Sequence, residues 1–119
     1  MQQLDNVLAF VGQREPPALE IRVNFGLFAS REATPAEIDE LARLLLPKVG
    51  GEVSIVREER HELSEHTEVS LQQVRVEVDA EHVPADPVER AELAGRLLEA
   101  AERWAQACIS DRRVEVNTS

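Results

Sequence analysis

The chain has 119 residues and a formal net charge of −10, from 23 acidic and 13 basic residues. This length fits one domain with one hydrophobic core, and the negative charge disfavours nucleic acid as a partner because a phosphate backbone would be repelled. No apolar run reaches the ~18 residues that a membrane span requires. The first twelve residues contain Asp5 and no basic region of the kind that opens a signal peptide. We therefore expect a cytoplasmic protein that does not enter the membrane.

The N-terminal residues carry Leu4, Val7, Leu8 and Val11 at helical spacing, ahead of the pair Pro16-Pro17. This spacing predicts a short helix with one apolar stripe, which the prolines end. Such a short helix is marginal alone in water and needs a covering surface. We expect residues 1–17 to form a helical segment with a linker, and residues 18–119 to form a single domain.

The next segment alternates apolar and polar residues from Leu19 to Leu27, which predicts a strand with one buried face. Thr34-Pro35-Ala36-Glu37 then has the order of an N-cap, a proline at the first helical position and a capping-box acid. We expect a helix from Pro35 to about Leu46, ended by Pro47 and the pair Gly50-Gly51.

Residues 52–63 begin with a β-rich run and continue with charged residues, which predicts a strand that extends beyond its sheet. After a turn, Val69 and Leu71 share one parity whereas Val74, Val76 and Val78 share the other. One face could stay apolar across Gln72-Gln73 only if an extra residue were inserted there, so we expect a β-bulge.

Asp86-Pro87-Val88-Glu89 repeats the capping pattern and predicts a long helix, with i,i+4 pairs Glu92–Arg96 and Glu99–Arg103. Residues 113–116 alternate briefly and predict a last strand. The resulting order, β-α-β-β-α-β, is that of an α+β domain with the ferredoxin-like split β-α-β arrangement. In that arrangement both helices cover one face of an antiparallel sheet.

The string from His61 to His66 resembles a metalloprotease helix motif, but that motif needs histidines at i and i+4 on one helix. Here the gap is five, and on a ribbon the two histidines have opposite parity. A solvated polar ribbon is the favoured interpretation, so we expect neither a metal site nor a cofactor. Cys108 has no cysteine partner, and its helical register predicts core packing rather than reactivity.

Two further surfaces could bind a ligand. Ser30 and Arg31, with the free amides at the start of the helix from Pro35, could hold an anion, although every capped helix start offers something similar. The open face of the sheet would present mixed charges, for which a solvated surface is the simpler interpretation. Its expected members are Glu20, Arg22, Asn24, Arg75 and Glu77.

The helix from Pro87 has an excess of apolar surface, because Leu93, Leu97, Ala100 and Trp104 form a second stripe beside the first. One sheet covers only one stripe well. The second stripe is therefore either an ordinary helix–helix contact or a surface for self-association. In either case we expect Trp104 to be buried.

The leading hypothesis is a non-enzymatic domain that acts through protein–protein contacts and forms a homodimer. The alternative is a small enzyme or ligand sensor that uses the loop with Ser30 and Arg31 as an anion site. No nucleophile with a nearby base can be identified, so catalysis is the less favoured hypothesis. The candidate interaction surface consists of Arg57, Glu59, His61, Glu65, His66, Leu93, Leu97 and Trp104.

Overall fold

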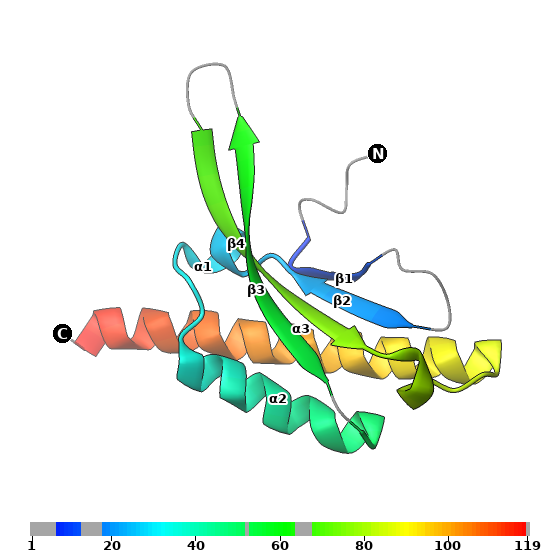
Figure 1. Cartoon of the computed structure of the whole chain (residues 1–119). Helices are drawn as coiled ribbons and strands as arrows, with labels where there is room; N and C mark the ends of the chain where they lie inside the picture. Colours follow the sequence, from blue (N-terminus) through cyan, green and yellow to red (C-terminus); the bar gives the residue numbers. More distant parts are fainter. Residues whose placement is uncertain (1–6, 13–17, 52, 64–67, 119) are drawn as a thin grey trace.

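A computed structural model describes residues 7–12, 18–51, 53–63 and 68–118 of the chain. It is an α+β fold with a four-stranded antiparallel sheet in the order β1-β2-β4-β3. The strands are β1 (Ala9–Val11), β2 (Leu19–Val23), β3 (Ser54–Leu63) and β4 (Glu68–Val78). The helices are α1 (Phe25–Ala29), α2 (Pro35–Val49), the short 3₁₀ helix η2 (Ala80–His82) and α3 (Pro87–Thr118). Figure 1 shows α2 and α3 lying on the same side of the sheet.

Both ends of the chain differ from the prediction, and the two differences are linked. Residues 9–11 are not helical: they form β1, which pairs antiparallel with β2. This strand occupies the sheet edge beside β2 that a strand at 113–116 would have taken, and those residues instead continue helix α3. Residues 9–11 of the N-terminal segment are thus part of the sheet, and its predicted residue Leu4 lies outside the described residues.

The β3–β4 hairpin extends well beyond the rest of the sheet, as predicted (Figure 1). β3 pairs with β4 from Ser54↔Glu77 to Leu63↔Glu68, whereas β2 pairs with β4 only along Val74–Val78. The predicted bulge at Gln72-Gln73 is wrong, because the register is unbroken. A bulge is unnecessary because both glutamines are buried with hydrogen-bond partners, one on each face of the strand.

β2 is shorter than the alternating pattern predicted. It ends at Val23, and residues 25–29 form α1, which ends at Ser30 in the left-handed conformation (φ 61°). Asn24 marks this change of direction: its backbone N–H donates to Leu8 O (2.8 Å) and its side-chain amide donates to Val7 O (2.8 Å). The chain therefore leaves β4 at this point and turns into the helix.

α2 begins as predicted and ends three residues later than expected. Thr34 Oγ1 accepts from the Glu37 N–H (3.1 Å) and the Glu37 carboxylate accepts from the Thr34 N–H (2.9 Å), which completes the capping box. Pro47 lies inside the helix, in its last turn, where a missing N–H removes only one hydrogen bond. Gly50 ends the helix with φ 74°, a conformation that glycine adopts without steric cost.

The core lies between the sheet and the helices, and it takes up the large side chains of the second apolar stripe of α3. Leu93, Leu97 and Trp104 are each 3% exposed or less. The Trp104 indole donates from Nε1 to Glu37 O (2.8 Å), and its ring centroid lies 5.3 Å from that of Phe25. The predicted burial of Trp104 is confirmed, and α1 and α2 of the same chain supply these contacts. These three residues are therefore core residues rather than members of an exposed interaction surface.

Candidate functional site

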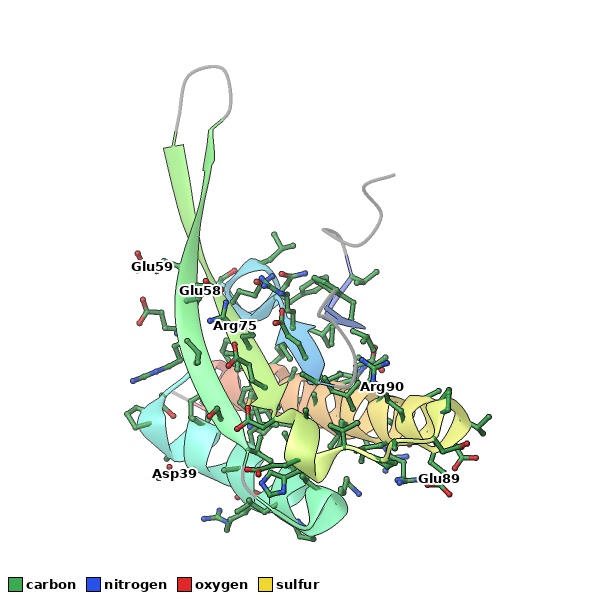
Figure 2. All side chains as sticks on the ribbon, turned by 45° about the vertical axis from the view of Figure 1, so that its right-hand side comes forward. Asp39, Glu58, Glu59, Arg75, Glu89 and Arg90 are labelled. Carbon is green, nitrogen blue, oxygen red and sulfur yellow. The ribbon has the colours of Figure 1, made fainter. Side chains whose placement is uncertain are left out.

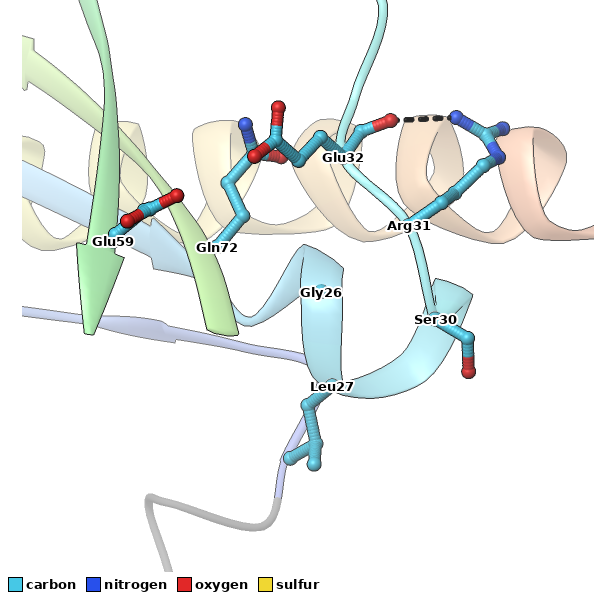
Figure 3. Close-up of a pocket in the computed structure, with 7 residues that line it drawn as sticks. All are labelled: Gly26, Leu27, Ser30, Arg31, Glu32, Glu59 and Gln72. Carbon is cyan, nitrogen blue, oxygen red and sulfur yellow. Dashed lines mark hydrogen bonds between the residues drawn. The ribbon is translucent and has the colours of Figure 1, made fainter. Parts of the chain in front are cut away.

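Two adjoining cavities lie between the loop that joins α1 to α2 and the inner side of the β3–β4 hairpin. They have volumes of about 280 and 330 Å³ and share Glu32, Glu59 and Gln72 as lining residues. We call this pair of cavities the acidic groove. Figure 3 shows that the side chains of Glu59 from β3, Gln72 from β4 and Glu32 from the loop face the same space. The remaining lining residues are Gly26, Leu27, Ser30, Arg31, Arg57 and Glu58.

The position of the groove depends on a close approach between α1 and β4. A Cβ atom added to Gly26 would lie 2.5 Å from the backbone nitrogen of Gln72, so this residue must lack a side chain. Backbone atoms of a central strand cannot move aside cheaply. On the same face, Gln72 Oε1 accepts a hydrogen bond from the Ala33 N–H (2.7 Å). These two contacts hold both ends of the loop against β4.

Arg31 points away from the groove, towards α3 (Figure 3). Its guanidinium binds the Glu37 carboxylate through two hydrogen bonds of 2.8 Å each and donates to Glu32 O (2.9 Å). It also lies over the Phe25 ring, 5.3 Å from the centroid. This Arg31 pairing, a hydrogen bond first of all, lowers the pKa of Glu37 from 4.5 to about 2.

The predicted anion site therefore already contains an anion from the chain itself. Glu37 occupies the start of α2 with its own carboxylate, where it meets both the Arg31 guanidinium and the Thr34 N–H. Ser30 lines the acidic groove from the loop, but in Figure 3 its hydroxyl points away from Glu32 and Glu59. Arg31 and Ser30 thus belong to the wall of the groove, and the charges left there without a partner among the described residues are two carboxylates and the Arg57 guanidinium, which leaves a net negative charge.

The negative charge of the groove comes from Glu32 and Glu59. Both are exposed, and neither carboxylate has a hydrogen-bond or ion-pair partner among the described residues. Glu58, at the outer end, is instead bound to Arg75 by two contacts of 3.0 Å. Arg57 lines the second cavity and is the only basic residue there. An incoming cation would thus find two free carboxylates.

The other residues of the predicted interaction surface lie in different parts of the chain. Arg57 and Glu59 are exposed on β3, as expected for the ribbon, and both line the groove. His61 lies in β3 opposite Ser70, whereas Glu65 and His66 lie outside the described residues. One groove is therefore lined by both the ribbon and the loop, which were predicted as separate sites.

Sequence reasoning missed the role of Glu32 and Gln72 in the groove, and it interpreted Gly26 only as a glycine that permits a turn before Arg31. Glu32 has no distinguishing pattern around it, and Gln72 was interpreted only as part of a bulge. Gly26 gave a usable signal, since a glycine within an apolar run indicates a close backbone approach. Gln72 gave another, because a polar residue between apolar strand positions needs a hydrogen-bond partner.

The outer face of the sheet carries a connected polar network rather than separate solvated charges. Arg22 pairs with Glu20 and donates to Gln73 Oε1 (2.8 Å), and Gln73 donates to Asn24 Oδ1 (2.7 Å). Glu20, Asn24 and Gln73 are buried, with Gln73 only 1% exposed. Arg75 joins the network through Glu58 and through Glu77, whose Oε2 lies 2.8 Å from Arg75 Nε. Figure 2 shows Glu58 and Arg75 close together beside the hairpin.

Comparison with protein-family models, with curated proteins and with solved structures finds no match to this chain. Among the described residues, no group of three or more His, Cys, Asp or Glu residues is placed to hold a metal ion. No helix in the same part of the chain is long and apolar enough to cross a membrane. The function must therefore be argued from the residues of the groove.

We predict that replacing Glu37 with Gln makes stability less dependent on acid. Because the folded-state pKa of about 2 lies below the ordinary value of 4.5, ionised Glu37 stabilises the fold above pH 4.5. This contribution is lost as the pH falls from 4.5 through about 2. Glu37→Gln should cost ~1.5–3 kcal/mol of unfolding free energy at neutral pH, and the cost should shrink as acid protonates the wild type.

Urea unfolding of both proteins from neutral pH down to about pH 2 measures this difference. Asp39→Asn is the matched control, since Asp39 is an exposed acid on the same helix without a partner among the described residues. A cost for Glu37→Gln that stays constant across the pH range would contradict the role of the ion pair.

Proposed function

We propose that this chain is a non-enzymatic interaction domain that binds a basic segment of a partner protein in the acidic groove. The observation that carries the proposal is the pair of carboxylates, Glu32 and Glu59, that face one cavity without a cationic partner among the described residues. The residues that line the two cavities include neither histidine nor cysteine. A carboxylate can act as a general base, but neither Glu32 nor Glu59 is in hydrogen-bond contact with a nucleophile among the described residues, so we favour binding.

An arginine or lysine side chain is the complementary ligand for such a site. A guanidinium placed between the two carboxylates would form charge-assisted hydrogen bonds with both. Gln72 adds a second contact, because its Oε1 is used by Ala33 while its Nε2 has no partner among the described residues. This amide can donate to a backbone carbonyl of the bound segment.

The shape and the overall charge of the molecule also support a peptide-like ligand. The second cavity continues from the first along β3, past Glu59 to Arg57 and Glu58, so the groove is longer than one side chain requires. The formal charge of −10 attracts basic partners over long range and raises the rate of association. A basic segment lying along the hairpin satisfies both features.

For the fold, we propose a ferredoxin-like arrangement in which the fourth strand comes from the N-terminus. In support, β2 and β3 flank β4 and are joined through α2, which is a split β-α-β unit, and β1 lies at the edge beside β2. A fold of this kind occurs with many functions, so it adds nothing to the functional argument.

The groove proposal predicts that a short peptide with two arginines, acetylated and amidated at its ends, binds the wild-type protein. Glu32→Gln combined with Glu59→Gln should weaken this binding about tenfold or more, which corresponds to one or two lost charged contacts. Fluorescence anisotropy of a labelled peptide gives the Kd, and a peptide with glutamines in place of the arginines should not bind. Binding should also weaken as the salt concentration rises.

The control is Asp39→Asn combined with Glu89→Gln, which removes the same charge from two exposed acids. Figure 2 shows both residues far from Glu59, on α2 and at the start of α3. This control should bind the peptide nearly as well as the wild type does. Equal weakening in the two double variants would mean that only diffuse charge attracts the peptide, and the groove proposal would fall.

Self-association remains a second proposal, on a different surface from the one predicted. The stripe of α3 that motivated it is buried within the chain, but four apolar residues near β1 and α1 are 37–42% exposed: Val7, Val11, Leu27 and Phe28. We expect light scattering at micromolar concentration to give twice the monomer mass of 13.3 kDa. Phe28→Ser should shift this towards the monomer, and a 13.3 kDa wild type throughout that range would contradict the proposal.

A further inference from the structure

We infer that the chain has a second binding site, separate from the acidic groove and of opposite charge, which takes a small organic anion. The site is a cavity of about 380 Å³ where the end of α2, the short helix η2 and the first third of α3 meet. Figure 1 shows the end of α2 beside the segment that joins β4 to α3. Lys48, His82 and Arg96 line the cavity, and Glu81 is its single acidic residue.

Two consecutive glycines make this arrangement possible. Gly50 ends α2 in the left-handed conformation and itself lines the cavity. A Cβ atom on Gly51 would lie 2.3 Å from His82 Nδ1, so the imidazole packs directly against the backbone there. The ring is therefore held at the edge of the cavity, where 26% of its side chain is exposed.

The lysine and the arginine that line the cavity form no ion pair with a carboxylate among the described residues. Five arginines of the described part of the chain are bound to carboxylates, namely Arg22, Arg31, Arg43, Arg75 and Arg103. Lys48 and Arg96 have no such partner among the described residues. The predicted Glu99–Arg103 pair is present, with a contact of 3.1 Å, but no ion pair joins Arg96 to Glu92. In a chain with a net charge of −10, two free cations at one cavity favour an anionic ligand.

The lining also indicates the chemical class of the anion. The buried side chains of Leu93 and Val83 contribute apolar surface to the cavity beneath the charged residues. An organic anion with an apolar body fits this combination better than a bare inorganic ion does, since binding sites pair apolar walls with a few polar groups. A phosphate ester and a carboxylate share this chemistry.

The experiment is an NMR titration of the amide resonances with phenyl phosphate, benzoate, inorganic phosphate and phenol. We expect phenyl phosphate or benzoate to bind with a Kd on the order of millimolar, and to shift the amides of residues 48–51 and 81–84. Inorganic phosphate and phenol, which each lack one half of the required chemistry, should bind more weakly. The ratio between phenyl phosphate and benzoate identifies the preferred anionic group.

Lys48→Ala and Arg96→Ala should each weaken binding about tenfold, and Gly51→Ala should displace the imidazole and weaken it as well. Arg103→Ala is the control, because it removes the same charge from the same helix outside the cavity. Lys48 also offsets the negative end of the α2 dipole, so unfolding midpoints are measured for every variant. Equal weakening in Arg103→Ala, or shifts spread over all exposed cations, would overturn the site, as would the absence of any binding.

Discussion

The close contact between Gly26 and the backbone of Gln72 is the constraint on which the candidate site depends. It allows α1 to lie directly on β4 beyond the last residue of β2. The part of β4 that precedes Val74 therefore has α1 next to it instead of β2. The loop after α1 then returns along β4, where Ala33 is bound by Gln72. The ion pair between Arg31 and Glu37 closes this loop onto the start of α2. The acidic groove is the space left between this fixed loop and the hairpin.

The distribution of charges explains why an acidic chain can contain two sites of opposite sign. Three arginines are bound to carboxylates within the fold, Arg22 and Arg75 on the outer face of the sheet and Arg31 at the start of α2. The carboxylates of Glu32 and Glu59 are left without such partners, and so are the cations Lys48 and Arg96 at the other end of α2. Unpaired charges that face a cavity indicate a binding site better than the net charge of the chain does. The net charge also counts exposed ion pairs, which contribute little to stability or recognition.

Local patterns in the sequence correctly predicted those elements that depend on residues close together in the chain. The capping box at Thr34 and the long helix from Pro87 are examples, since caps and helical periodicity depend on neighbours within a few residues. The hairpin that outruns the sheet was also predicted from its charged residues. The predicted bulge is absent from the structure. The prediction assumed that only apolar side chains could be buried here, but Gln73 is buried with its amide hydrogen-bonded to Arg22 and Asn24.

The remaining errors come from contacts between distant segments. Whether residues 9–11 or residues 113–116 take the sheet edge beside β2 is decided by tertiary pairing, which no local pattern records. The alternation from Leu19 to Leu27 continues through Phe25, but the burial of Phe25 is achieved in a helix that packs against Trp104. The acidic groove was missed for the same reason, since Glu32, Glu59 and Gln72 come from three segments.

The candidate site requires that Gln72 and Gly26 hold the loop in place before any partner binds. Amide hydrogen exchange of Ala33 tests this most directly, because this N–H lies in a loop and its partner is the Gln72 side chain. We expect Ala33 to be protected to nearly the same degree as the core amides of β4. Gln72→Leu should abolish this protection while the β2–β4 amides keep theirs. Exchange of the Ala33 amide at the rate of a free loop in the wild type would contradict the account.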